Sequence, residues 1–273
     1  MIGYLGPQGT YSEKAAVLYS KDTVRTAYNS IDDVIEAVDC GKLEIGIVPI
    51  ENSIEGSVNA TMDKLIFTAN IKIIGEVVIS IAHDLLVNTC YDGGEITKIL
   101  SHAQALGQCR RFLNNNYNGV QQEVTSSTAE AARLVSESKK NWAAIGNPLC
   151  ADIYGLKILK EAIQDNRDSE TRFVVISKKT NEKFISGCKT AIAFGINHEP
   201  GALARVLNIL ALWDINMNKI ISRPMKDCIG EYAFFVEMEG HIAEENLQNA
   251  VKMLQRKTSF CKYLGSYPVC ARI

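Results

Sequence analysis

The chain has 273 residues, of which 47% are apolar and 22% are charged, and its formal net charge is -2. This apolar fraction excludes a disordered chain, and the length predicts two or three compact units. A charge so close to neutral provides no broad basic field, so nucleic acid and anionic membrane surfaces are poor candidates for partners. We therefore expect a small-molecule ligand.

The sequence also lacks the signals of secretion and of metal binding. The stretch MIGYLGPQGTYSEK has no basic segment ahead of an apolar one, and no run reaches about 18 apolar residues, which predicts a cytoplasmic protein. The eight cysteines form no C-x-x-C pair, and the four histidines form no H-x-x-x-H pair. We expect reduced structural thiols and neither a metal site nor a redox dithiol.

The first two thirds of the chain alternate short apolar runs with segments of helical period. In chain order these are IGYL before an Ala-rich helix, EIGIVPI before a helix at 59–69, KILS before a helix at 103–113, and WAAIG before a helix at 149–154. This rhythm predicts an α/β fold around a mostly parallel sheet. Residues 71–87 are too long for one ordinary strand, so we expect strands that cross between two lobes.

A polar stretch after Ser177 predicts a linker at 179–187, after which the pattern restarts. The remainder reads as strand 188–196, helix 201–212, strand 215–223, strand 231–239, helix 243–256 and strand 262–269. This order is typical of a ferredoxin-like βαββαβ unit. We expect a two-lobed part at 1–178, with crossings near 75–80 and 160–165, and a second domain at 188–273.

Three expected strand-to-helix junctions carry the S/T-x-x-E/Q capping box, at Thr10, Ser101 and Ser127. In an open α/β sheet such junctions gather at the carboxyl ends of the strands, where helix N-termini offer free N–H groups to an anion. Two further loops, GPQGT at 6–10 and PIENSIEGS at 49–57, lie at similar places, and GPQGT matches neither nucleotide-binding glycine motif. One box alone is ordinary helix capping, but the set favours a site for a dianion.

Taken together, these stretches resemble the prephenate dehydratase family. The resemblance is carried by GYLGPQGTYSEKAA at 3–16, GIVPIENSIEGSV at 46–58, SHAQALGQCR at 101–110 and TSSTAEAA at 125–132. It continues through Tyr154, Leu156, Leu159 and Asp165 to Thr171-Arg172-Phe173, a spacing that is highly specific for the family's catalytic region.

The resemblance implies two α/β lobes like those of a type II periplasmic binding protein, with the active site in the cleft between them. It also implies that 188–273 is an ACT domain, which binds L-phenylalanine as an effector at the interface of a homodimer or homotetramer. The motifs NHEPGALARVL at 197–207 and Ile221-Ser222-Arg223-Pro224 carry this second likeness. Ile221 stands where the family usually has glutamate, which removes a charge beside the expected effector site, and Ser169 stands where it often has asparagine. Because the chain opens on IGYLGPQGT, we expect no chorismate mutase domain ahead of it.

The implied activity converts prephenate to phenylpyruvate with loss of CO2 and water. Because the product ring is aromatic, the reaction runs downhill and needs a site that holds the dianion and assists the departing hydroxyl, with no cofactor. Thr171 is the expected hydrogen-bond donor to the leaving oxygen. Arg172 should point to the opposite face of an extended segment, so either it pairs with a carboxylate of the other lobe or the backbone bends there; we favour a structural role. His102 and Glu51 are the alternative acids.

These arguments give three sets of expected functional residues. The catalytic set is Thr171, Arg172, Phe173, Glu51, Asn52, Ser53 and His102. The substrate-binding set is Gln8, Gly9, Thr10, Gly56, Ser101, Gln104, Ser127 and Thr128. The effector-binding set is Asn197, Glu199, Pro200, Gly201, Ala202, Leu203, Ser222 and Arg223. Two other functions stay open: an arogenate dehydratase, which acts on a substrate with an amino group in place of the keto group, and a non-catalytic amino-acid sensor.

Overall fold

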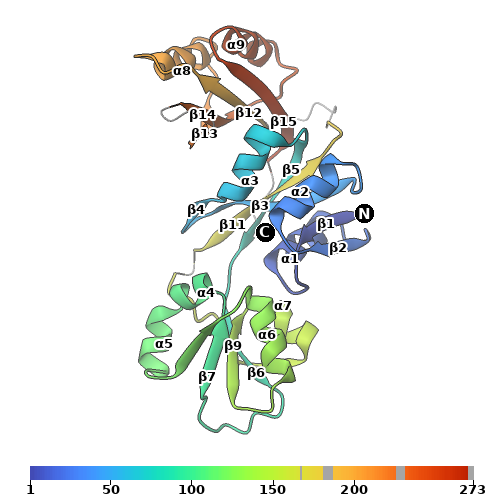
Figure 1. Cartoon of the computed structure of the whole chain (residues 1–273), viewed down its shortest axis with the longest axis vertical. Helices are drawn as coiled ribbons and strands as arrows, with labels where there is room; N and C mark the ends of the chain where they lie inside the picture. Colours follow the sequence, from blue (N-terminus) through green and yellow to red (C-terminus); the bar gives the residue numbers. More distant parts are fainter. Residues whose placement is uncertain (167, 181–186, 226–230, 270–273) are drawn as a thin grey trace.

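A computed structural model describes residues 1–166, 168–180, 187–225 and 231–269, and these residues form three β-sheets (Figure 1). The three sheets follow one another along the long axis of the molecule, with the first sheet in the middle. No helix among the described residues is long and apolar enough to cross a membrane.

The first sheet has the strand order β2-β1-β3-β11-β5, with the short β4 paired to β3. Its strands are β1 (Ile2–Leu5), β2 (Arg25–Tyr28), β3 (Ile45–Asn52), β4 (Gly56–Ser57), β5 (Lys72–Ser80) and β11 (Glu170–Ser177). The helices beside it are α1 (Tyr11–Tyr19), α2 (Ile31–Asp39), α3 (Asn59–Asp63) and the π-helix Lys64–Thr68. β1 is parallel to β2 and β3, as predicted for alternating strands and helices, whereas β11 is antiparallel to β3 and β5.

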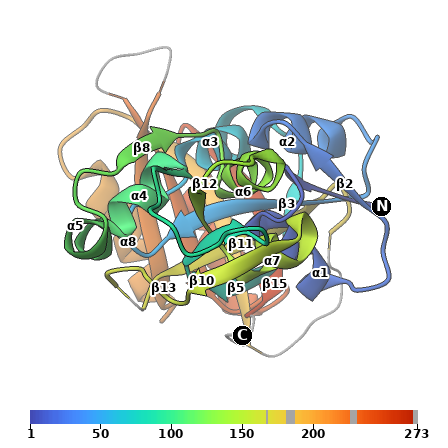
Figure 2. The same ribbon diagram turned by 90° about the horizontal axis from the view of Figure 1, so that it is seen from below.

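The first sheet is apolar on both faces because helices cover both of them. Side chains alternate between the faces along each strand. Ile47 therefore packs with the core on the α1 side, whereas its neighbour Val48 packs with the core on the α2 side. Figure 2 shows α1 and α2 on opposite sides of β3. Burial on both faces explains why the strands read as continuous apolar runs in the sequence.

The second sheet has the strand order β10-β6-β9-β7-β8. Its strands are β6 (Asp84–Asn88), β7 (Lys98–Ser101), β8 (Gln121–Val124), β9 (Trp142–Gly146) and β10 (Leu156–Lys160). The helices beside it are α4 (Ala103–Gln108), α5 (Arg110–Asn116), α6 (Thr128–Glu137) and α7 (Pro148–Tyr154). The single helix expected at 103–113 is thus two helices, α4 and α5, which meet at Cys109.

Two of the three predicted helix N-caps are confirmed, and one is wrong. Thr10 Oγ1 accepts from the N–H of Glu13 at 3.3 Å, and Ser127 Oγ accepts from the N–H of Glu130 at 3.0 Å. Ser101 instead ends β7, where its buried hydroxyl donates to the Ile145 carbonyl at 2.7 Å. The cap of α4 is the next residue, His102. The motif failed there because the strand continues one residue further than the box requires.

The chain passes from the first sheet to the second over residues 81–83, and it returns between Lys160 and Glu170. The first crossing lies just beyond the expected 75–80. Those residues belong to β5, which pairs with β11 as far as Ser80. This pairing keeps the strand in the first sheet until its last residue.

The third sheet has the strand order β13-β14-β12-β15. Its elements in chain order are β12 (Cys188–Ile196), α8 (Ala202–Leu212), β13 (Met217–Pro224), β14 (Tyr232–Glu239), α9 (Glu245–Gln255) and β15 (Phe260–Pro268), which is the βαββαβ order that the sequence predicts. Most of the expected linker, 181–186, lies outside the described residues, as do Cys228 and Cys270.

The third sheet packs tightly against β5 of the first sheet. Leu264 and Tyr267 of β15 share one buried core with Ile71 and Ile73. At Gly265, with φ +137°, a Cβ would lie 2.1 Å from the Ile73 carbonyl oxygen, so only glycine allows this approach. The first and third sheets are therefore in direct, close contact.

Candidate active site

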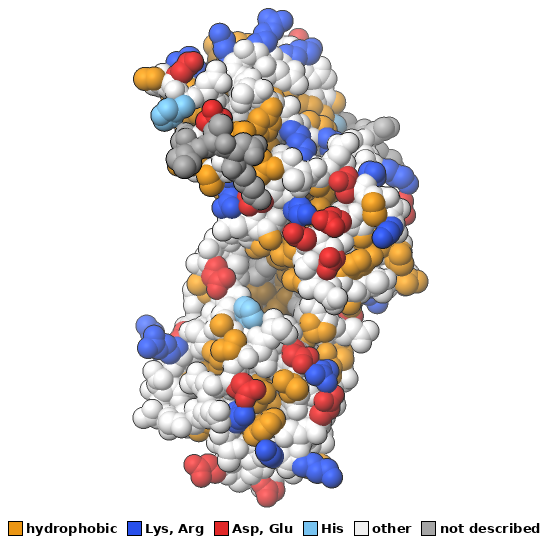
Figure 3. Space-filling view, in the orientation of Figure 1, with side chains coloured by type: hydrophobic (Ala, Val, Ile, Leu, Met, Phe, Trp, Pro, Cys, Tyr) orange, Lys and Arg blue, Asp and Glu red, His pale blue; other side chains and the backbone are white. Residues whose placement is uncertain are grey.

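A cavity of about 210 Å³ lies between the first and second sheets, and we call it the intersheet pocket. The space-filling view shows the surface hollowed at this level (Figure 3). Its lining residues are Tyr11, Asn52, Ile81, His83, His102, Gln104, Ala105, Gln108, Ser126, Ser127, Thr128 and Thr171. Thr171 and Asn52 come from the first sheet, whereas the residues from 102 to 128 come from the second. The pocket therefore exists only where the two sheets face each other.

Thr171 is held at the pocket by Asn52, which pairs with it across β11 and β3. Asn52 Nδ2 donates to Thr171 Oγ1 at 2.9 Å. The other end of the amide, Oδ1, accepts from the N–H groups of Ile54 and Glu55 at 2.9 and 3.2 Å, which fixes its orientation. Because Thr171 Oγ1 already accepts from Asn52, its own hydroxyl proton is available to a molecule in the pocket.

The second sheet contributes the N-terminus of α6, a helix of 10 residues, through Ser127 and Thr128. The unpaired N–H groups and positive dipole end of a helix favour an anion there. Across the pocket, His102 Nδ1 accepts from the N–H of Gln104 at 3.4 Å. The neutral ring therefore carries its proton on Nε2, the nitrogen that is not used in capping.

Six lining residues were missed by the sequence-based prediction: Tyr11, Ile81, His83, Ala105, Gln108 and Ser126. His83 is 4% exposed, and its Nε2 lies 2.8 Å from Gln108 Oε1. Burial lowers the pKa of His83, although the bond to Gln108 opposes the shift. Gln108 follows Gln104 by four residues, so the helical period could have placed both on one face. No pattern marks His83, which stands alone in an apolar run.

Several expected residues lie elsewhere. Ser101 is buried behind the pocket, and Phe173 is 2% exposed in the core of the first sheet. Glu51, Ser53 and Arg172 line a separate cavity of about 450 Å³, which opens toward the third sheet. Four more residues of the predicted substrate-binding set do not line the pocket: Gln8, Gly9, Thr10 and Gly56.

The GPQGT loop serves as an interface to α7 rather than as a lining. The Gly9 carbonyl accepts from Asn147 Nδ2 at 2.6 Å, and the Gln8 carbonyl accepts from the Tyr154 hydroxyl at 2.8 Å. Thr10 Oγ1 is occupied by the α1 cap and by a bond to the Leu5 carbonyl at 2.9 Å. These contacts fasten the first sheet to the second beside the pocket.

Arg172 points to the face opposite Thr171, as strand alternation predicts. Its Nη1 lies 2.8 Å from Glu237 Oε1 and 3.1 Å from Glu76 Oε2, and its Nη2 lies 3.3 Å from Glu51 Oε2. None of these carboxylates belongs to the second sheet, so the first of the two alternatives, a pairing with a carboxylate of the other lobe, is not what the structure shows. The alternative of a bent backbone is also present, because the register of β11 shifts between Arg172 and Phe173.

The prephenate dehydratase family model matches residues 2–181 of this chain. The chain belongs to the prephenate dehydratase family. It is 42% identical over 273 residues to the prephenate dehydratase of Methanocaldococcus jannaschii, and the match covers 97% of each chain. It is 35% identical over 283 residues to the chloroplastic arogenate dehydratase/prephenate dehydratase 2 of Arabidopsis thaliana, covering 98% of this chain and 72% of the relative.

The crystal structure of the prephenate dehydratase from Arthrobacter aurescens in complex with L-Phe is also similar. It has a TM-score of 0.89 and 32% identity, and the match covers 98% of this chain and 89% of that one. Together with the family model, these likenesses confirm the predicted mixed α/β fold, prephenate dehydratase as the function, and the hydro-lyase class.

In this member of the family, the expected effector residues separate into two groups. A hollow of about 200 Å³ at the start of α8 is lined by Asn197, Glu199, Gly201, Ala202 and Leu203, together with Ile196, His198, Ala204, Tyr232 and Phe234. Pro200, Ser222 and Arg223 are not among its lining residues. Arg223 instead binds Asp63 of α3, with Nε 2.7 Å from Oδ1. Ile221 packs against the core shared with the first sheet.

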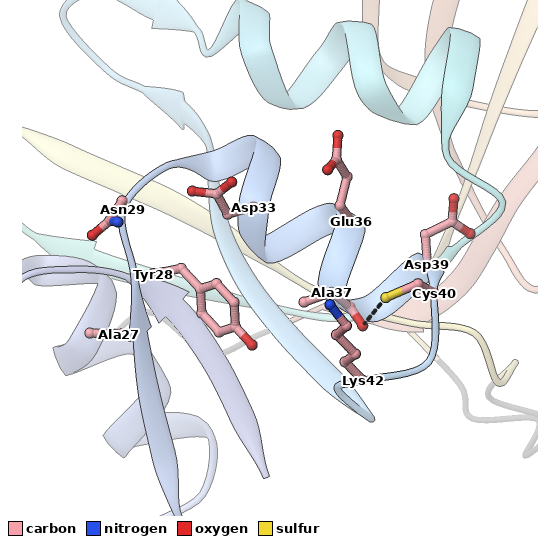
Figure 4. A pocket seen from close by; sticks show the side chains of 9 residues that line it. All are labelled: Ala27, Tyr28, Asn29, Asp33, Glu36, Ala37, Asp39, Cys40 and Lys42. Carbon is pink, nitrogen blue, oxygen red and sulfur yellow. Dashed lines mark hydrogen bonds between the residues drawn. The ribbon is translucent and has the colours of Figure 1, made fainter.

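A larger hollow of about 760 Å³ lies between β2 and α2 (Figure 4). Asp33, Glu36 and Asp39 border it, and Lys42 is the one basic residue among the described residues of its lining. A dianion such as prephenate would be repelled by this acidic rim. The intersheet pocket is therefore the better candidate for the active site of a prephenate dehydratase.

Proposed function

We propose that the decarboxylating dehydration of prephenate takes place in the intersheet pocket. The observation that carries the proposal is the Thr171 hydroxyl, which Asn52 holds at 2.9 Å so that its proton faces a pocket rich in uncharged donors. In the reaction, the bond from the ring to its carboxylate breaks and its electrons form the aromatic system. The ring hydroxyl leaves at the opposite carbon, and with one proton it becomes water. Thr171 stabilises the departing oxygen by donating a hydrogen bond.

The pocket suits a doubly negative substrate without a guanidinium or an ammonium group. Among the residues that the structure describes, its lining includes no lysine, arginine, aspartate or glutamate. Hydroxyls, amides and the N-terminus of α6 replace part of the hydration of the carboxylates, and such neutral donors neither trap the CO2-losing carboxylate nor repel it. Arg172 and Glu51 are therefore proposed to act from outside the pocket. Of the two candidate acids, His102 lines the pocket and Glu51 does not.

The second candidate substrate is arogenate, and the relative from Arabidopsis thaliana carries both names. Arogenate carries an ammonium group in place of the keto oxygen, and the described part of the lining, which has no carboxylate, offers that group no counter-charge. We therefore propose prephenate as the preferred substrate. Relative kcat/KM on the two compounds decides the point, and a higher value on arogenate would overturn the preference.

We further propose that the first and second sheets are the two lobes of a periplasmic-binding-protein-like catalytic part, residues 1–178. In the same proposal, 179–187 is the linker and 188–273 is a regulatory ACT domain. The hollow at the start of α8 would take L-phenylalanine, its backbone N–H groups meeting the carboxylate and Leu203 and Phe234 meeting the ring. The half-exposed β13 is a free sheet edge, which a second copy would cover in a homodimer or a homotetramer.

A direct assay tests the central proposal. The purified chain is mixed with prephenate at neutral pH, and phenylpyruvate is followed by its absorbance in alkali; Thr171→Ala is the matched variant. We expect turnover by the wild type and a loss of at least about 100-fold in the variant. An amino-acid sensor would bind without turnover. Retained turnover in a folded Thr171→Ala protein would refute the role of Thr171.

A further inference from the structure

Six charged side chains gather where the first sheet meets the third, and we call them the charge cluster: Glu51, Glu76, Arg172, Lys189, Lys219 and Glu237. Its three carboxylates match its three cations, and one further carboxylate, Glu170, lines the same cavity. The side chains of Glu76 and Glu237 are only 2% exposed, and that of Arg172 is 11% exposed. Charges removed from water to this extent are stable only when each has a partner, so the loss of one member disturbs the others.

Glu237, on β14 of the third sheet, is the partner closest to Arg172. Its Oε1 lies 2.8 Å from Arg172 Nη1 and accepts from the Tyr267 hydroxyl at 2.6 Å. Burial by itself would raise the pKa of Glu237, but the Arg172 guanidinium and the Tyr267 hydroxyl hold that pKa below its usual range. Glu237 is therefore ionised at neutral pH, and its charge is directed at Arg172.

The register of β3 and β11 connects this cluster to the intersheet pocket. Asn52 pairs with Thr171, and the adjacent residues Glu51 and Arg172 pair with each other. The first pair lines the intersheet pocket, and the second pair lines the cavity of the charge cluster. The third sheet thus forms ion pairs with Arg172 and Glu51. These two residues are the chain neighbours of Thr171, which carries the proposed catalytic hydroxyl, and of Asn52, its hydrogen-bond donor.

We propose that Glu237 is a positioning residue for the dehydration: by holding Arg172 it fixes the β11 backbone and hence the Thr171 hydroxyl. Lys219 acts in the same way on the other strand, because its Nζ lies 2.8 Å from Glu51 Oε2. This inference rests on the proposed function of the intersheet pocket. It assigns to the third sheet a contribution to catalysis that does not depend on any effector.

The local backbone of β11 explains why these ion pairs are needed to position Thr171. On the β3 side the register shifts directly after Arg172, so the pairing with β3 constrains β11 less there than the pairing with β5, which is regular from Glu170 to Val175. Without the Glu237 charge, the guanidinium would move toward Glu51 and Glu76 and carry its backbone with it. A displacement well below 1 Å at Thr171 is enough to slow a reaction that depends on orientation.

The test is the isosteric variant Glu237→Gln, which keeps the contact with Tyr267 and removes the charge. We expect kcat on prephenate to fall by about tenfold or more while KM stays within about twofold, because the pocket lining is untouched. Glu237→Asp, which retains the charge, should recover at least about a third of the wild-type kcat. A merely structural role would lower the melting temperature without this split between kcat and KM.

Asp63→Asn is the matched control, because it removes the carboxylate of another ion pair between the first and third sheets, Arg223–Asp63 at 2.7 Å, away from the charge cluster. Its kcat should equal that of the wild type. An equal kcat for Glu237→Gln and Asp63→Asn would overturn the inference, provided that the wild type turns over prephenate; an inactive wild type would refute the proposed function instead. Should Glu237→Gln not fold, Lys219→Met is judged by the same kcat criterion.

Discussion

Asn52 and Thr171 lie 119 residues apart in the chain, yet they face each other across β3 and β11, with Nδ2 and Oγ1 separated by 2.9 Å. The amide is locked by two backbone N–H groups that donate to its Oδ1. The bond therefore has a fixed direction, from asparagine to threonine. This direction leaves the threonine proton available to a molecule in the intersheet pocket.

The substitution Asn52→Asp replaces the Nδ2 donor by a carboxylate oxygen. The Thr171 proton would then turn toward the new carboxylate, whose charge would also repel the dianionic substrate. We expect kcat/KM on prephenate to fall by about 100-fold to 1,000-fold. Steady-state kinetics measure the effect, and Asn208→Asp on the exposed surface of α8 provides the same change of charge far from the pocket. Equal kinetics for the two variants would contradict the assigned hydrogen bond.

Thr171→Ser and Thr171→Val separate the hydroxyl from the shape of the side chain. Serine retains the donor and should keep kcat within about tenfold, whereas valine fills the same volume without a donor and should lose at least about 100-fold. Circular dichroism checks that both proteins are folded. If valine were as active as serine, the leaving hydroxyl would need a different hydrogen-bond donor.

His83 should make stability depend on pH. Burial lowers its pKa from the ordinary value of 6.5, so the folded chain stays unprotonated at a pH where the unfolded chain binds a proton. The contribution of the neutral ring is fully present above about pH 6.5 and is lost as the pH falls from there through the lower, folded-state pKa. As the pH is lowered from about 8 to about 5, the melting temperature of the wild type should fall more steeply than that of His83→Gln. Parallel curves would rule out a depressed pKa.

Leu203 should affect the response to phenylalanine but not the basal reaction. It lines the hollow at the start of α8, which we propose to be the effector site. Leu203→Ala removes apolar contact worth about 2 kcal/mol, so the phenylalanine concentration for half-maximal effect should rise by about tenfold or more. Activity is recorded with and without phenylalanine, and calorimetry measures binding. An unchanged dissociation constant would move the effector site elsewhere.

Local patterns in the sequence predicted helices and strands well where only neighbouring residues determine them. Capping at Thr10 and Ser127 and the strand-helix order of residues 188–269 needed only neighbouring residues, so both could be read directly. The family likeness added Thr171, Asn52, His102 and the residues at 104, 127 and 128, all of which line one pocket. Strand β2, which is half-buried at the sheet edge, gave too weak a pattern to be predicted.

Only the tertiary structure decided which face each of these residues occupies. Asn52 and Glu51 are neighbours in one motif, but the pleat of β3 sends the first to the intersheet pocket and the second to the charge cluster. His83 and Gln108 meet because the crossing segment 81–83 approaches α4, and Arg172 meets Glu237 because the third sheet docks against the first. Such contacts depend on how sheets from distant parts of the chain pack together. A pattern of neighbouring residues does not predict that packing.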